Sequence, residues 1–364
     1  DEANFKDWSA IPRIGDIIAI NGEVWTSSTG EKTVLANKGF QRLQKAHVGF
    51  PDKWHGMTDP ELVRRKRWLE CATNPEARQL FRNRSNLIRF IRSYLEQKDF
   101  MEVETPVLTP QASGAQARPF ITHHNALDAD FYLRIAPETY LKRMTVAGFD
   151  RVFEIGKQFR NEGIDPSHLQ EFTSLEWYAS YWDYADNMKF FRNMLADLWK
   201  QFSYDNCRSI KDKLQAWAKA PIVKYRDLFM EHTGRNPDDM SAKDADLLFK
   251  TDVRPKLIDP IFVMDYPAHM SPMAARHPDD PKTVQQWQFI VEGWEVVKCY
   301  TVLTDPVLQR QLLEAQMQER ANGDDEAMMI EEDFLECMDH GMPPQSGCGV
   351  GIDRLASLLF GVSN

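Results

Sequence analysis

The chain has 364 residues, 43% hydrophobic and 27% charged, which is typical of a soluble globular protein with one large domain and a small one. No apolar run approaches the roughly 20 residues of a membrane span, and the amino-terminal residues DEANFKDW have no signal-peptide pattern. A net charge of −10 argues against indiscriminate nucleic-acid binding, although a local basic patch is compatible with it. The five cysteines form no C-x-x-C pair, so neither a zinc site nor a disulfide framework is indicated, and a reducing cytoplasm is the expected compartment.

The first part of the chain predicts a small β region followed by helices. Short strands are expected at Ile14–Val24, Lys32–Leu35 and Phe40–Lys45. Residues 51–73 read as a linker and a basic helix, in which Arg64–Arg67 could meet a phosphate backbone or form a solvated face. Apolar residues at helical spacing then predict a long helix over Asn74–Lys98, followed by a strand over Phe100–Pro106.

Residues 151–184 carry two alternating runs around a turn-rich segment at 163–167, which predicts an antiparallel hairpin. Because side chains alternate across a strand, such a hairpin gathers polar and aromatic side chains on one face. The residues of that face are Glu154, Gln158, Arg160 and Glu162 in the first run, and Phe172, Ser174, Glu176 and Tyr178 in the second. An ordinary half-solvated sheet would show the same alternation.

Three later segments also carry sequence patterns that bear on the structure. Residues 185–254 are predicted to be mostly helical, with no role that the sequence assigns. Gln288–Leu303 predicts a second hairpin, turning at Glu292–Gly293. The glycines of Gly347–Leu355 have the spacing G-x-G-x-G rather than G-x-G-x-x-G, and no βαβ unit surrounds them, so a dinucleotide-binding loop is not indicated.

The combination FRNEG, a loop with His168, and EFTSLEWY resembles motif 2 of the class II aminoacyl-tRNA synthetases, and the lysyl type within them. The long helix with the strand ending at Pro106 resembles motif 1, and Gly347–Leu355 resembles motif 3, a strand leading into a helix. The likeness covers roughly residues 50–364. It implies an α+β fold, with the class II antiparallel sheet flanked by helices in residues 74–364. Residues 1–50 resemble part of an OB-fold of the anticodon-binding type, joined by the linker and basic helix at 51–73.

The resemblance implies a site for ATP and Mg²⁺. Arginine suits phosphate because its fork is permanently charged and can bind oxyanions in two places. Arg160 and Arg354 are the implied catalytic residues, Arg160 at the α-phosphate and the substrate carboxylate, Arg354 at the adenine and γ-phosphate. Phe172 would stack on the adenine and Glu162 accept from its amino group. His168 would approach the outer phosphates, and Glu295 and Gln288 stand at the metal-binding positions.

The resemblance also implies an amino-acid pocket, in which this sequence departs from the family. Gly114, Glu138 and Arg160 would hold the α-amino and carboxylate groups, with Glu176 and Tyr178 deeper. Gln288 stands where the first metal-binding glutamate is expected, whereas Glu295 keeps the second. The remaining departures are Trp294 for an arginine, Lys298 for an asparagine, Tyr300 for a phenylalanine and Val302 for a glutamate.

The change at Val302 bears on the substrate, because the family's glutamate there would pair with the lysine ε-ammonium. A buried ammonium without a carboxylate partner costs several kcal/mol, and Lys298 adds like charge nearby. Either the substrate is not plain lysine, or other carboxylates such as Glu176 compensate.

The leading hypothesis is ATP- and magnesium-dependent formation of an aminoacyl-adenylate, with lysine or a relative as the amino acid and tRNA as the acceptor. One alternative is a paralogue that activates a different amino acid or modifies an acceptor other than tRNA. Another is a noncatalytic ATP-binding regulator on the synthetase fold. The resemblance at motif 1 also implies a homodimer. The lack of a long apolar run predicts no membrane partner.

Overall fold

The computed structural model describes residues 12–36, 38–51, 57–163, 165, 168–201, 207–323 and 326–362. Ile164, Pro166 and Ser167 of the predicted turn therefore lie outside the described residues. The chain divides into two compact units, Asp1–Arg82 and Asn83–Asn364. The division falls within helix α3 (Pro75–Glu96), at whose start the sequence predicts the large domain to begin.

The first unit contains two antiparallel strand pairs and two short helices. Its elements are β1 (Ile17–Ile20), β2 (Glu23–Thr26), β3 (Lys32–Leu35), β4 (Phe40–Gln44), α1 (Pro60–Arg65) and α2 (Arg67–Thr73). β1 pairs with β4 and β2 pairs with β3. The single strand predicted over Ile14–Val24 is in fact two strands, because Asn21 and Gly22 interrupt the extended backbone between them. The predicted strands at 32–35 and 40–45 are confirmed.

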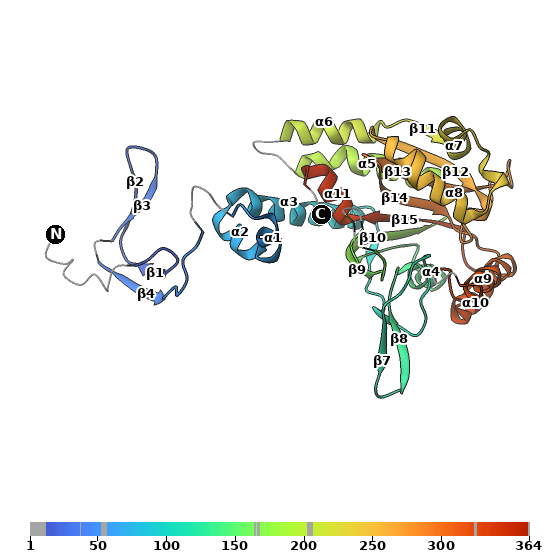
Figure 1. The fold of residues 1–364 in the computed structure, drawn as a ribbon, viewed down its shortest axis with the longest axis horizontal. Helices are drawn as coiled ribbons and strands as arrows, with labels where there is room; N and C mark the ends of the chain where they lie inside the picture. Colours follow the sequence, from blue (N-terminus) through green and yellow to red (C-terminus); the bar gives the residue numbers. More distant parts are fainter. Residues whose placement is uncertain are drawn as a thin grey trace. The chain divides into compact units, whose positions relative to one another are not determined.

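In the second unit, eight strands of the described chain form one sheet (Figure 1). In spatial order they are β11 (Ile222–Lys224), β12 (Ile261–Pro267), β13 (Thr283–Val291), β14 (Trp294–Thr301), β15 (Gln345–Gly351), β10 (Glu171–Ser180), β9 (Arg151–Phe159) and β5 (Met101–Glu102). Neighbours are antiparallel except at the two edges, where β11 pairs with β12 and β5 with β9 in parallel. The mostly antiparallel sheet confirms the predicted fold class.

The predicted hairpins are present, with shorter strands in places. The turn between β13 and β14 is at Glu292–Gly293 as expected, both with positive φ. The strand predicted over Phe100–Pro106 keeps ladder geometry only at Met101–Glu102, although the Val103 amide still donates to the Phe153 carbonyl. β9 ends at Phe159, before Arg160 and Glu162.

Helices and a small three-stranded sheet complete the second unit. The helices are α4 (Glu138–Val146), α5 (Tyr184–Leu198), α6 (Cys207–Ala218), α7 (Tyr225–Thr233), α8 (Ala242–Leu248), α9 (Pro306–Ala321), α10 (Glu332–Asp339) and α11 (Ile352–Phe360). The small sheet consists of β6 (Leu108–Thr109), β7 (Ile121–His124) and β8 (Ala129–Leu133), in the order β6-β8-β7. Among the described residues, the helical character predicted for 185–254 is confirmed apart from β11, while residues 202–206 of this range lie outside them.

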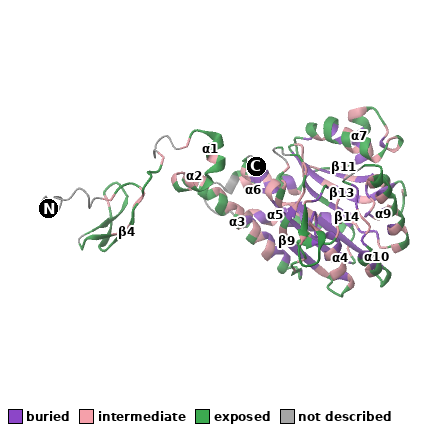
Figure 2. Cartoon of the chain, turned by 60° about the horizontal axis from the view of Figure 1, so that its bottom comes forward, coloured by how far each residue is buried: buried purple, intermediate pink, exposed green. Residues whose placement is uncertain are grey.

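Two hydrophobic cores pack against the large sheet. One contains apolar residues of α3, α5, α6 and α11 together with Leu175, Trp177 and Val297 of the sheet. The other contains residues of α4, α7 and α10 with Tyr178 and Tyr300. Figure 2 shows the buried residues gathered along the strands and the helices that cover them. The sheet is therefore a rigid platform for the side chains on its polar face.

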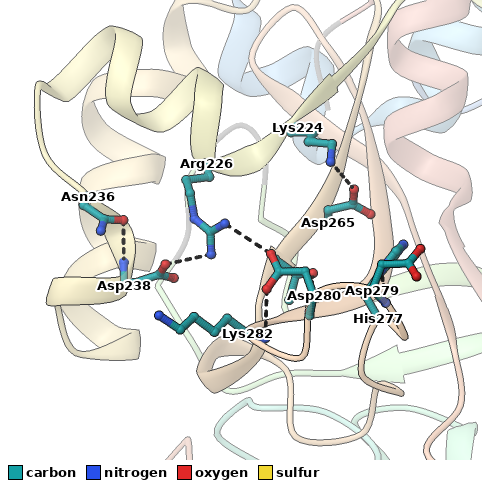
Figure 3. A network of polar contacts seen from close by, with 10 residues as sticks. Lys224, Arg226, Asn236, Asp238, Asp265, His277, Asp279, Asp280 and Lys282 are labelled. Atoms are coloured by element: carbon teal, nitrogen blue, oxygen red, sulfur yellow. Dashed lines mark hydrogen bonds and ion pairs between the residues drawn. The ribbon is translucent and has the colours of Figure 1, made fainter.

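A polar network fixes the loop before β13 to the helical region (Figure 3). Arg226, in the first turn of α7, pairs with Asp238 at 2.7 Å and with Asp280 at 3.3 Å. The backbone amide of Lys282 donates to Asp280 at 3.2 Å. Since Arg226 joins two segments that lie far apart in the sequence, the network holds residues 277–282 against α7.

Candidate active site

Strand register aligns the predicted site residues in two rows on one face of the large sheet. The first row, from β9 across to β13, is Glu154, Glu176, Gly349, Lys298 and Gln288. The second row, from β10 to β13, is Tyr178, Gly347, Tyr300 and Gln286. Residues two apart on each strand share this face because side chains alternate.

The alternating glycines of β15, Gly347 and Gly349, leave the middle of this face without projecting side chains. A Cβ atom added to Gly347 would lie 2.2 Å from the ring of Tyr178, so only glycine allows that ring to lie over β15. Gly114 is required mainly for its backbone conformation. Its φ of +83° lies in the left-handed region, and a Cβ atom added there would lie 3.1 Å from Glu138.

The face forms the floor of a cavity of about 790 Å³. It is lined by the predicted residues Gly114, Glu138, Arg160, Glu162, His168, Phe172, Glu176, Tyr178, Gln288, Glu295, Lys298, Tyr300 and Arg354. Val302 is the exception. It is 2% exposed, packs in the second core and does not line the cavity. The departure from the family at this position therefore changes the packing beside the pocket rather than its wall.

A buried lysine anchors Glu138 at one end of the cavity. Lys142 is fully buried one helical turn after Glu138 and donates to its carboxylate at 2.5 Å. The Tyr300 hydroxyl donates to the same carboxylate oxygen. The rings of Tyr300, Phe334 and Tyr178 surround the Lys142 ammonium at 5.3, 5.7 and 5.8 Å. Glu138 thus presents a carboxylate of fixed orientation to the cavity.

Two further carboxylates lie beside it with different environments. Glu154 is buried against Arg134 at 2.5 Å and accepts from the Thr105 hydroxyl at 2.6 Å. Burial, and then the nearby charge of Glu138, raises the pKa of Glu176 to about 8. With this pKa, the Glu176 carboxyl is mostly protonated at neutral pH in the free protein.

Another part of the cavity, around Phe172, carries cationic side chains. The guanidinium of Arg160 lies 5.2 Å from the Phe172 ring centroid. Arg354 donates to the backbone carbonyl of Glu295 at 2.8 Å, and burial lowers the pKa of its guanidinium, which nevertheless stays charged. His168 contacts Asp165 at 2.7 Å on the loop of the hairpin. Two arginines that share a cavity wall with an aromatic ring suit a nucleotide's phosphates and base.

The family described as tRNA synthetases class II (D, K and N) matches residues 59–364 of this chain. The chain belongs to this family. Similar relatives include the lysine–tRNA ligases of Aquifex aeolicus (strain VF5), 42% identical, and of Clostridium tetani (strain Massachusetts / E88), 39% identical. The chain is also 39% identical to the lysine–tRNA ligase of Prochlorococcus marinus (strain MIT 9301).

Each of these comparisons covers 98% of this chain. The chain spans 64% of the length of the Aquifex protein, 76% of the Clostridium protein and 74% of the Prochlorococcus protein. These matches confirm the predicted family and its lysyl type. No helix in the described part of this class II synthetase is long and apolar enough to cross a membrane.

The family implies the use of ATP and Mg²⁺, and the cavity fits both. Glu295 supplies one carboxylate, while the Gln288 carbonyl oxygen accepts from Tyr266 at 2.7 Å. The described residues hold no cluster of three or more His, Cys, Asp or Glu side chains suited to a metal. Magnesium usually takes one or two carboxylates together with substrate phosphates, so Glu295 beside a bound triphosphate meets that need.

Several residues that line this synthetase's cavity, or support its wall, were not predicted from the sequence. Lys142 was missed because a Glu and a Lys four residues apart usually form an exposed helix pair. Helix α8 brings Ser241, Lys243 and Asp246 to the cavity wall, although its sequence carries no motif. Gln158 and Ser174 lie on the predicted polar face, so the alternation of the hairpin signalled them without giving them a role.

Proposed function

We propose that this chain joins lysine to ATP, forming lysyl-adenylate and pyrophosphate, and then transfers the lysyl group to tRNA. The observation that carries the proposal is one cavity with two chemically distinct regions. Arg160, Arg354 and Phe172 favour a nucleotide, whereas Glu138 and Glu176 favour an amine. A zwitterionic amino acid fits between them, with its carboxylate toward Arg160.

The reaction forms a bond between a carboxylate oxygen and the α-phosphorus and breaks the bond to the departing pyrophosphate. Arg160 neutralises the approaching carboxylate and the α-phosphate, which would otherwise repel each other. Glu138, held by Lys142, orients the α-ammonium. Bound Mg²⁺ would offset charge on the outer phosphates next to Glu295 and Arg354.

Lysine as the substrate is supported by the lysine–tRNA ligases among the relatives and by the Glu138 carboxylate, beside which the Glu176 carboxyl can ionise when an ammonium binds. Lys298, on the cavity wall, favours a second candidate, an amino acid without a side-chain cation, because it adds positive charge there.

Charging of unfractionated tRNA, measured with each standard amino acid, tests the proposal. The expected result is attachment of lysine that depends on ATP and Mg²⁺. Attachment of another amino acid instead would establish the second candidate. If no amino acid is attached although lysine-dependent exchange of pyrophosphate into ATP occurs, the acceptor is something other than tRNA.

We further propose that the protein is a homodimer that acts in the cytoplasm. The motif 1 segment, α3 with β5, supports the dimer, because β5 is an edge strand and carries the exposed apolar side chain of Met101. A twofold contact there would cover this edge in both copies.

A further inference from the structure

A buried glutamine on the cavity floor has no hydrogen-bond partner among the residues that the structure describes. Gln158 is 1% exposed and lines the cavity, and neither its Nε2 nor its Oε1 meets a partner in the described chain. An amide buried in this way is costly, and native proteins nearly always satisfy it. Gln286, equally buried on the same floor, shows the normal case, because its Oε1 accepts from Ser271 at 2.6 Å.

Two other buried polar groups near Gln158 also lack a hydrogen-bond partner among the described residues. Gln158 is the cross-strand partner of Phe172 and lies two residues before Arg160. The buried Nε of Arg160 and the buried hydroxyl of Ser174, both on the cavity wall, also have no partner among the described residues. All three side chains can donate hydrogen bonds, and Arg160 carries a full charge.

Their spacing points to a common ligand. Residues two apart along extended backbone are separated by about 6.6 Å, so Gln158 and Arg160 can reach one oxyanion group from two sides. The acceptor-rich residues Glu138 and Glu176 lie on the same cavity wall and suit the ammonium groups of the substrate. Three unpaired donors, one of which carries a full positive charge, suit an anionic group.

We infer that Gln158 is a further substrate-binding residue, whose Nε2 donates to the carboxylate–α-phosphate group that Arg160 holds. The inference rests on the proposed function. As the new bond forms, negative charge concentrates on these oxygens. A donor fixed in a buried position is then worth more in the transition state than in the ground state. Loss of the amide should therefore lower kcat more than it raises KM for ATP or lysine.

Lysine-dependent exchange of pyrophosphate into ATP tests this in the full chain with Gln158→Met, Gln158→Glu and a matched control. The control is Gln345→Met, since Gln345 is 0% exposed in the same sheet, lacks partners for both amide atoms and does not line the cavity. We expect Gln158→Met to lose about 10- to 100-fold in kcat/KM, as for a hydrogen bond to a charged group. Gln345→Met should stay within about twofold of wild type.

Gln158→Glu should lose more than Gln158→Met, because a carboxylate would face the same anion. Thermal melting checks folding, and both Met variants should melt no lower than the wild type, since each removes an unpaired buried amide. Exchange by Gln158→Met within about twofold of wild type overturns the inference and leaves the proposed function standing. If the wild type shows no exchange with any amino acid, the proposed function fails. In that case the inference, which rests on the proposed function, fails with it.

Discussion

At the scale of single residues, Glu176 should couple substrate binding to pH. Its pKa of about 8 leaves the free protein with a neutral carboxyl at pH 7, and a bound ammonium favours the carboxylate. Lysine binding should therefore release a proton, and lysine affinity should rise as the pH increases toward about 8. Calorimetry in buffers of different ionisation enthalpy measures the release. Glu176→Gln should abolish it, and an unchanged release in this variant would contradict the assignment.

The same residue predicts how the stability of the free protein depends on pH. The folded-state pKa of Glu176, about 8, lies above the ordinary value of 4.5, so between these values the folded protein binds a proton that the unfolded chain has lost. Its contribution to stability is present below pH 4.5 and is lost as the pH rises through about 8. Denaturant titrations at several pH values should show Glu176→Gln to be less sensitive to pH than the wild type over this window.

Substitution of the buried Lys142 should lower the free energy of unfolding considerably. Lys142→Met would leave the buried Glu138 carboxylate without its cation, which costs about 3–5 kcal/mol. Lys157→Met is the matched control, because Lys157 pairs with Glu171 at 3.1 Å on the exposed surface and should contribute about 0–1 kcal/mol. Urea denaturation measures both. Equal losses in the two variants would show that the Lys142 pair does not anchor Glu138.

Among the secondary-structure elements, β15 determines how closely the Tyr178 ring can pack on the cavity floor. Gly347→Ala would drive a Cβ into the Tyr178 ring, so Tyr178 or the strand must shift, at a cost of about 1–3 kcal/mol. In Gly349→Ala the added Cβ would meet Glu176 at an ordinary 3.7 Å, and the free energy of unfolding should change much less. The difference between the two variants in the free energy of unfolding, measured by denaturation, separates the cost of the close contact from the general effect of replacing a glycine.

The hairpins and the glycine strand could be predicted because their side chains repeat with the strand period of two. That period alone placed Glu154, Phe172 and Glu176 on one face, and the motifs then added Arg354 from a distant segment. Helix α8 could not be placed, since its approach to the cavity depends on tertiary packing. For the same reason the sequence could not distinguish Val302 beside the pocket from a residue that lines it.

At the scale of the whole molecule, the motif 1 segment predicts association. Sedimentation at micromolar concentration should give the mass of a dimer, with both copies carrying a complete cavity. Replacing the exposed Met101 with a charged residue should shift the protein toward the monomer if β5 lies at the contact. A wild-type monomer with full exchange activity would contradict the proposed dimer.

We propose that the cavity on the polar face of the large sheet activates lysine with ATP. Exchange of radiolabelled pyrophosphate into ATP, screened over the standard amino acids and lysine analogues, measures that step directly. We predict exchange with lysine in the wild type. We also predict a loss of several orders of magnitude in Arg160→Gln, because the carboxylate and the α-phosphate lose their shared cation. A folded wild type that binds ATP but gives no exchange with any amino acid would contradict the claim.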